Sequence, residues 1–221
     1  MNPSSPPALS LRATLMRTLT AVAFVALAAA VASCSLSRPS PVKRTFLLEP
    51  KLPAAVSTAP KPYSIRIGVV NVAAPFRGRQ FVFRESDLKF ESDFYDEFFV
   101  APAIMFSDAT AKALVAANAF RRVVPFGATS DDGDYTLDGF VSELYADMRD
   151  TAAPAAVITV TYYLTPTSAF GSNVVWSHEY RQSVKISGTG PEAVARGWNA
   201  ALSAVLADLA RDLAAAELPA K

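Results

Sequence analysis

Cysteine and histidine, the side chains most often used for nucleophilic or metal chemistry, each occur once in this chain of 221 residues, as Cys34 and His178. An internal disulfide needs a second cysteine, and a structural zinc site needs about four sulfur or nitrogen ligands. A catalytic triad would have to be built around His178. The sequence therefore excludes an internal disulfide, argues strongly against a zinc site, and leaves the Cys34 thiol without a partner.

His178 lies in a segment in which apolar and polar residues alternate, as in a strand with one buried face. Trp176 and Tyr180 share the parity of His178, whereas Ser177 and Glu179 point to the opposite side because successive strand residues alternate. The nearest nucleophile and acid therefore face away from the imidazole. We predict a semi-buried or edge histidine, and no enzyme active site.

The acidic run "SDDGD", from Ser130 to Asp134, resembles a fragment of a calcium-binding loop. A calcium loop of this type needs a glutamate about six residues after its glycine, and this chain has Gly139 there. We predict a polar turn that leads into the next strand, and no metal site.

Five aromatic residues lie close together in the sequence: Phe94, Tyr95, Phe98, Phe99 and Phe106. They could pack into the core beneath a loop. Alternatively, Phe94, Tyr95, Phe98 and Phe99 could form an exposed patch that contacts a partner protein or an acyl chain. The acidic residues between them fit the rim of such a patch, and the sequence leaves both interpretations open.

The N-terminal segment has the organisation of an export signal. Arg12 and Arg17 precede an apolar run from Leu19 to Ala30, whose length is typical of a signal peptide and too short to span a bilayer comfortably. The run ends in "VASC", which resembles the bacterial lipobox and implies cleavage before Cys34 and attachment of lipid to its thiol. The alternative is an ordinary secretory signal with a chance cysteine. Ser35 after Cys34 resembles the pattern of outer-membrane sorting in Gram-negative bacteria.

These features divide the chain into three parts. Residues 1–33 are predicted to be the signal peptide, 34–62 an acylated N-terminus with a flexible proline-containing tether, and 63–217 a single periplasmic domain. Without residues 1–33 the basic residues fall from 21 to 19 against 20 acidic ones. This balance gives no reason to expect nucleic-acid binding.

Within the body, the hydrophobic pattern predicts strands at 44–50, 63–72, 79–86, 134–147, 156–167 and 173–187, with a further strand beginning near 87. Alanine-rich and amphipathic segments predict helices from Pro102 to Phe120 and from Pro191 to about Leu213. We therefore expect an α+β two-layer sandwich, a mainly antiparallel sheet with two amphipathic helices packed on one face.

The body also resembles the auxiliary lipoproteins of ABC-type intermembrane transport systems, a family that includes the lipoprotein of the paraquat-inducible operon. The resemblance rests on the lipobox and on the segments "TFLLEP", "IRIGVVNVAAPFRGRQFVFR", "DFYDEFFVAPAIMFSDATAKAL" and "DYTLDGFVSELYAD", followed by a long C-terminal helix. It implies an outer-membrane lipoprotein, anchored on the periplasmic side, that contacts a mammalian-cell-entry-domain protein, a permease and an ATPase during lipid transport. The chain itself has no phosphate-binding loop of the G-x-x-x-x-G-K-[ST] type.

A periplasmic scaffold or activator lipoprotein for peptidoglycan assembly is the alternative function on a body of this kind. No cofactor is expected apart from the covalent lipid on Cys34, and the sequence leaves homo-oligomer formation open.

Overall fold

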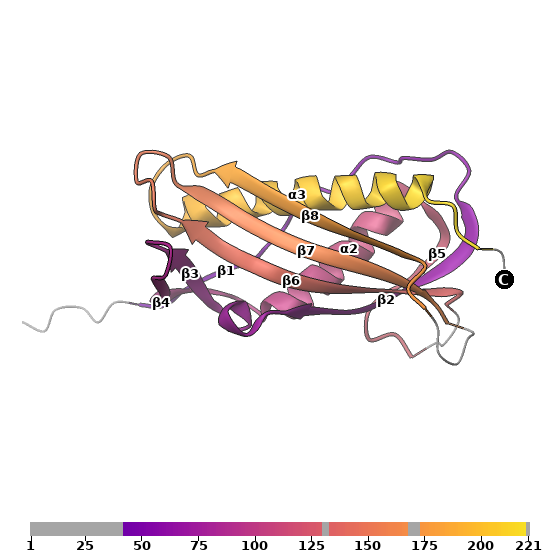
Figure 1. The fold of residues 1–221 in the computed structure, drawn as a ribbon, viewed down its shortest axis with the longest axis horizontal. Helices are drawn as coiled ribbons and strands as arrows, with labels where there is room; N and C mark the ends of the chain where they lie inside the picture. The colour runs from indigo at the N-terminus through magenta and orange to yellow at the C-terminus, as the bar shows by residue number, and fades with distance from the viewer. Residues whose placement is uncertain (1–41, 130–132, 168–172, 220–221) are drawn as a thin grey trace, which may run out of the picture. The chain divides into compact units, whose positions relative to one another are not determined.

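The structure is a computed structural model that describes residues 42–129, 133–167 and 173–219. Cys34 and the expected signal peptide lie outside these residues. The part of the chain from Lys43 to Lys221 forms one compact unit (Figure 1). The folded body therefore starts earlier than the expected boundary at Tyr63, because a short strand in the expected tether belongs to the sheet.

The described residues form eight strands, two long helices and one short 3-10 helix, η2 (Ala74–Phe76). The strands are β1 (Arg44–Phe46), β2 (Lys61–Val72), β3 (Gln80–Arg84), β4 (Phe90–Phe98), β5 (Phe120–Val124), β6 (Tyr135–Asp147), β7 (Ala155–Pro166) and β8 (Trp176–Lys185). The helices are α2 (Pro102–Ala117) and α3 (Pro191–Ala215), and both begin with proline as predicted.

Strand β6 organises the sheet because it pairs with three other strands. Antiparallel β7 runs along one edge of β6 for nearly its whole length. The other edge is shared, with β2 beside Tyr135–Val141 and β3 beside Ala146–Asp147, both parallel to β6. Helix η2 occupies the connection between β2 and β3. Beyond them, β5 pairs with β2, and β4 and β1 follow β3.

The predicted α+β sandwich is confirmed, and the strand directions refine it. The sheet is mixed, with four parallel and three antiparallel pairings. Part of the difference comes from β5, whose first residue, Phe120, was expected in the preceding helix. Asn118 instead ends α2 in the left-handed conformation, with φ of 52°. β5 then runs parallel to β2, as a strand reached through a helical crossover does.

Both helices cover the same face of the sheet, α2 against β2 and β5, and α3 against β7 and β8 (Figure 1). Gly197 allows α3 to approach β7, since a Cβ there would lie 2.8 Å from the Cβ of Ala156. Trp198 is fully buried against the rings of Phe81 and Phe98, and its indole N–H donates to the carbonyl of Tyr145. The core therefore reaches β4, the strand that carries most of the aromatic residues singled out above.

Candidate functional site

The expected aromatic patch is divided between the surface and the core. Phe94 is 69% exposed, Phe99 62% and Tyr95 40%, and the rings of Phe94 and Tyr95 pack edge to face at 5.1 Å. Phe98 and Phe106 are buried, which corrects the expectation that Phe98 belongs to an exposed contact surface. Phe98 lies at the end of β4 that pairs with both β1 and β3, and its ring packs against Phe81 and Trp198 in the core.

Strand β1 fixes the strand that carries these rings. Arg44 makes two parallel hydrogen bonds to the buried carboxylate of Asp96, at 2.7 and 2.9 Å. The carboxylate of Glu97, also buried, accepts from Arg79 at 2.6 Å and lies 3.5 Å from the ammonium of Lys43. These acidic residues are therefore neutralised inside the fold and do not form the exposed rim that the sequence suggested. We call Phe94, Tyr95 and Phe99, together with β1 and β4, the aromatic edge.

Lys43 completes the aromatic edge on the side where the chain enters the folded body. Its ammonium lies 5.0 Å from the centre of the Phe94 ring, a distance at which the ring attracts the cation. Phe99 follows the end of β4, where its N–H donates to the carbonyl of Phe46 and its own carbonyl accepts from Arg79. The exposed rings are thus attached to a firmly held backbone.

His178 lies on β8, which pairs only with β7 among the described strands, and its side chain is exposed. The imidazole packs against the rings of Trp176 and Tyr180, and Ser177 and Glu179 lie on the opposite side of the strand, as predicted. Tyr180 is held by a hydrogen bond from its hydroxyl to Asp212, and burial together with that carboxylate raises the pKa of Tyr180. The described surroundings of His178 are therefore those of an edge histidine.

The acidic run lies partly outside the described residues, since 130–132 are not among them. The carboxylate of Asp134 accepts hydrogen bonds from the backbone N–H and the hydroxyl of Ser64, both at 2.8 Å, and so joins β2 to the start of β6. Within the described residues, no group of three or more histidine, cysteine or acidic side chains could hold a metal ion.

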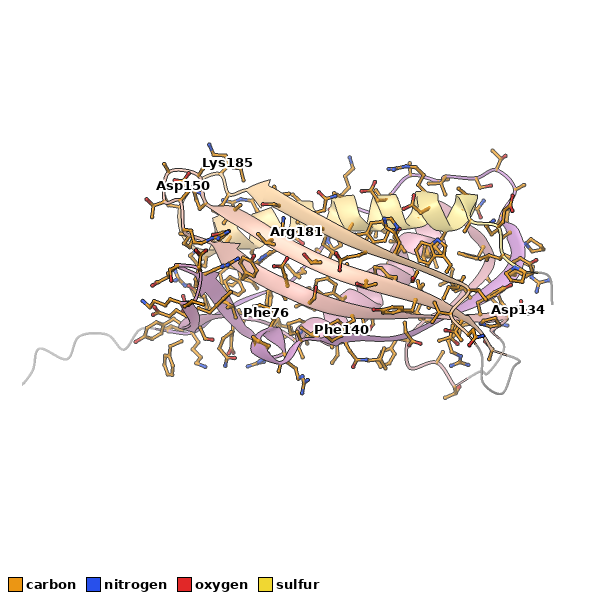
Figure 2. The ribbon with its side chains drawn as sticks, in the orientation of Figure 1. Phe76, Asp134, Phe140, Asp150, Arg181 and Lys185 are labelled. Carbon is orange, nitrogen blue, oxygen red and sulfur yellow. The ribbon has the colours of Figure 1, made fainter. Side chains whose placement is uncertain are left out.

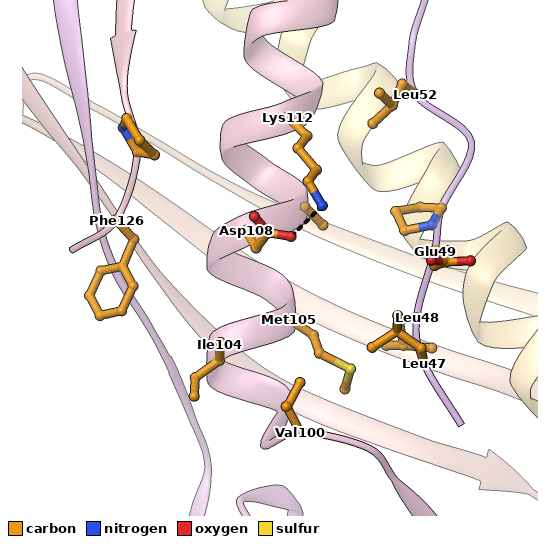
Figure 3. A pocket seen from close by; sticks show the side chains of 13 residues that line it. Leu47, Leu48, Glu49, Leu52, Val100, Ile104, Met105, Asp108, Lys112 and Phe126 are labelled. Atoms are coloured by element: carbon orange, nitrogen blue, oxygen red, sulfur yellow. Dashed lines mark ion pairs between the residues drawn. The ribbon is translucent and has the colours of Figure 1, made fainter. Parts of the chain in front are cut away.

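A cavity of about 420 Å³ lies on the outer side of α2 (Figure 3). Its floor is formed by the buried side chains of Leu48, Met105 and Ala109. The partly exposed side chains around it come from four places in the chain: residues 47–52 after β1, Val100 before α2, the first turns of α2, and Pro125 with Phe126 after β5. This arrangement leaves partly exposed apolar side chains around a buried apolar floor.

A second cavity of about 330 Å³ continues the first along α2. The two cavities share Leu52, Asp108, Lys112 and Pro125, and the second extends to Val115 and Ala116. From Ile104 to Ala116 the helix rises about 18 Å, at about 1.5 Å per residue. We call the two cavities together the α2 groove.

Charged groups lie at the shared part of the groove. The ammonium of Lys112 forms an ion pair with the carboxylate of Asp108 at 2.7 Å, and both side chains are largely exposed (Figure 3). The hydrogen bond and charge of Asp108, and to a smaller extent the charge of Glu49, raise the pKa of Lys112. An otherwise apolar groove therefore carries one positive and one negative group where its two cavities meet, and a second negative group, Glu49, in the larger cavity.

The α2 groove was not predicted from the sequence. The predicted inner face of the helix, which includes Met105 and Ala109, is confirmed, but Ile104 and Val115 on the outer face remain 52% and 63% exposed. A signal was present, because a helix that is apolar on nearly all sides needs a second covering element or a ligand. Leu52, which lies in the stretch 34–62 predicted to be a flexible tether, supplies part of that second wall.

Comparison with known proteins shows the family. The model of the ABC-type transport auxiliary lipoprotein component matches residues 46–214 of the chain. The chain therefore belongs to this family of auxiliary lipoproteins, as its resemblance had implied, and a lipoprotein family of this kind places it in the cell envelope. No curated protein matches the sequence.

Solved structures confirm the fold. The protein XCC0632 from Xanthomonas campestris has a TM-score of 0.68 at 17% identity, covering 78% of this chain and 95% of its own. A second crystal structure, of an uncharacterized protein, has a TM-score of 0.60 at 14% identity, covering 78% and 99%. At these identities the likeness concerns the fold alone. Among the described residues, no helix has the length and apolar character needed to cross a membrane.

Proposed function

We propose that this chain is an outer-membrane-anchored auxiliary lipoprotein of an ABC-type intermembrane lipid transport system that works with a mammalian-cell-entry-domain protein, a permease and an ATPase. It acts by protein–protein contact and not as an enzyme. The observation that carries the proposal is the family match over residues 46–214, which covers nearly all of the folded body.

The position of β1 supports a role close to a membrane. The compact unit begins at Lys43, nine residues after Cys34. Nine residues span at most about 30 Å when fully extended. If Cys34 carries the lipid, the aromatic edge stays within this reach of the membrane surface, which suits a component that receives or docks a periplasmic partner there.

The aromatic edge is the contact surface that we favour for the protein partner. Exposed aromatic rings on a well-ordered backbone supply apolar contact area at a low cost in conformational entropy. The salt bridges of Asp96 and Glu97 fix the backbone of β4 beneath Phe94 and Tyr95. This surface therefore needs little reorganisation on binding.

Co-purification tests the proposed contact. The full chain, extracted from bacterial membranes, is expected to retain the mammalian-cell-entry-domain protein, and Phe99→Asp to lose most of it. Phe140→Asp is the matched control, because Phe140 is also an exposed ring but lies on the sheet face that the helices leave open (Figure 2). Retention of cell-wall synthases in place of the transport protein would instead support the scaffold function.

Mass spectrometry tests the anchor. We expect the mature chain to begin at Cys34 and to carry a diacylglyceryl group on sulfur and an acyl group on nitrogen. Cys34→Ala should leave the chain unprocessed or release it from membranes. An unmodified cysteine, or cleavage at another position, would remove the anchor from the proposal.

A further inference from the structure

The α2 groove has the two properties of a ligand site for an amphipathic molecule: an apolar cavity and charged groups beside it. Its larger cavity, about 420 Å³, lies within the range of about 300–1,000 Å³ that is typical of small-molecule sites. Leu48, Met105 and Ala109 form a buried apolar floor, and Leu52, Ile104 and Phe126 are about half exposed around it. An inserted hydrocarbon chain would remove these exposed side chains from water.

One wall of the groove can adjust to what enters it. Residues 47–52 follow β1 without forming a helix or a strand. Within the described residues this wall is held by the buried side chain of Leu48 and by a hydrogen bond from the N–H of Lys51 to the hydroxyl of Ser203 on α3 at 2.8 Å. Such a segment shifts more easily than the helix that it faces, because its backbone is not held by a regular hydrogen-bond ladder.

The charges where the two cavities meet discriminate between headgroups. Lys112 is paired with Asp108, and Glu49 lines the larger cavity, so this part of the groove has one ammonium and two carboxylates (Figure 3). A free fatty acid would bring a further carboxylate to a site that is already negative. A headgroup with both a phosphate and an amine matches the arrangement, with the phosphate toward Lys112 and the amine toward the carboxylates.

We propose that the α2 groove binds one acyl chain of a zwitterionic phospholipid with an amine headgroup, placing the phosphate at Lys112 and the amine at Asp108 and Glu49. This inference rests on the proposed function in lipid transport and deepens it, because it assigns a lipid-binding site and a headgroup class to the auxiliary lipoprotein itself. The aromatic edge remains the surface for the protein partner.

Photolabelling tests the proposal on the full chain. The probe is phosphatidylethanolamine with a diazirine in one acyl chain, present in phosphatidylcholine vesicles that carry the lipoprotein. After irradiation, adducts are expected on peptides that contain Met105 and Phe126. Ile104→Asp should lower this labelling at least fivefold, because it places a charge beside the floor. Ile104 is half exposed, so its replacement should leave the folded body intact; Phe140→Asp should label like the unaltered chain.

A second comparison tests the headgroup. The same diazirine chain on diacylglycerol should label the groove less than the phosphatidylethanolamine probe does, and Lys112→Glu should abolish the difference. Equal labelling by both probes in the unaltered chain would overturn the assignment of the headgroup. Adducts spread evenly over the surface, or unchanged by Ile104→Asp, would overturn the site.

The two proposals fail separately. Loss of groove labelling with normal co-purification of the mammalian-cell-entry-domain protein would refute the lipid site alone. Normal groove labelling without that partner would refute the proposed function and leave the lipid site in place. No lipid adduct in the groove, together with loss of the partner protein in Ile104→Asp, would assign the groove to contact with that protein and overturn this inference.

Discussion

The aromatic edge and the α2 groove both expose apolar side chains, but the fold supports them differently. At the aromatic edge, two buried carboxylates are neutralised by Lys43, Arg44 and Arg79, which holds β1 and β4 together beneath the rings. In the groove, the nearby ion pair of Asp108 and Lys112 is exposed, and one wall has no regular structure. The aromatic edge is therefore held by buried ion pairs, whereas the α2 groove has one wall without regular structure.

The difference shows how one small domain can offer two kinds of recognition. A partner protein gains most from a surface that is already in its bound shape, because less entropy is lost on association. A flexible lipid chain needs an apolar volume that tolerates more than one conformation. The prediction from this comparison is that substitutions under the aromatic edge alter stability strongly, whereas substitutions in the groove alter binding and leave stability nearly unchanged.

The largest expected effect separates two phenylalanines of the same strand. Phe98→Ala should lower the free energy of unfolding by about 3–5 kcal/mol, because it opens a cavity against Phe81 and Trp198. Phe94→Ala removes an exposed ring and its contact with Lys43, and should cost less than about 1 kcal/mol. Urea titration followed by far-UV circular dichroism measures both. Equal losses would show that Phe94 is structural and would remove it from the contact surface.

This pair also shows what the sequence could predict. The spacing along α3 revealed its buried stripe correctly, because one face of that helix is apolar and the other polar. Alternation was a weaker guide in the sheet, since Val157 and Thr159 on the other face of β7 are buried as well and Val174, before β8, is 51% exposed. From Phe94 in β4 to Val100 just after it, every position is aromatic, acidic or apolar, and no period distinguishes Phe94 from Phe98. The register with β1 and β3, which the sequence does not contain, decides which ring enters the core.

The aromatic edge and the α2 groove also differ in how well the sequence predicts them. The aromatic residues could be singled out because they are concentrated in a short stretch. The α2 groove could not, since Leu48, Met105 and Phe126 are far apart in the sequence and meet only when β1 and β5 take their places around α2. The pairing of Asp96 and Glu97 was missed for a similar reason, because their basic partners lie far away in the sequence: Lys43 and Arg44 around the start of β1, and Arg79 just before β3.

The second-largest effect on stability is expected at the ion pair of Arg44 and Asp96, the clamp between β1 and β4 under the aromatic edge. Arg44→Ala should lower the free energy of unfolding by about 2–3 kcal/mol, because it leaves the Asp96 carboxylate, whose side chain is 6% exposed, without its bidentate partner. Asp96→Asn in the same background should recover part of the loss, since a neutral amide costs less to bury. A double-mutant cycle measures the coupling, and additive losses would contradict the clamp.

Glu143, on β6, provides an intermediate case, with its side chain 31% exposed. Burial opposes ionisation, but hydrogen bonds from Thr159 and Tyr145 and the charge of Arg181 outweigh it and lower the pKa of Glu143 below its usual 4.5. The unfolded chain therefore binds this proton more readily. The stabilisation is present above about pH 4.5 and is lost as the pH falls through the lower pKa of the folded state.

Glu143→Gln tests this dependence and should cost less than about 1 kcal/mol at pH 7. The difference between the variant and the unaltered chain should shrink in urea titrations performed at successively lower pH, from 7 to 3. Arg181 lies on the open face of the sheet (Figure 2), and Arg181→Gln should reproduce part of the effect. A difference that grows on acidification would contradict the sign of the pKa shift.

The smallest effect on stability is expected in the groove. Asp108→Asn removes the exposed partner of Lys112, and its side chain is 59% exposed in the folded state. Water already solvates both groups, so the midpoint of urea unfolding should stay within experimental error at 0.1 M salt and at 1 M salt alike. The same variant removes one of the two carboxylates proposed to face the lipid amine, and should therefore weaken photolabelling by phosphatidylethanolamine relative to diacylglycerol. A loss of stability comparable to that of Arg44→Ala would mean that the groove is clamped as tightly as the aromatic edge, and the contrast between a fixed and an adjustable surface would no longer hold.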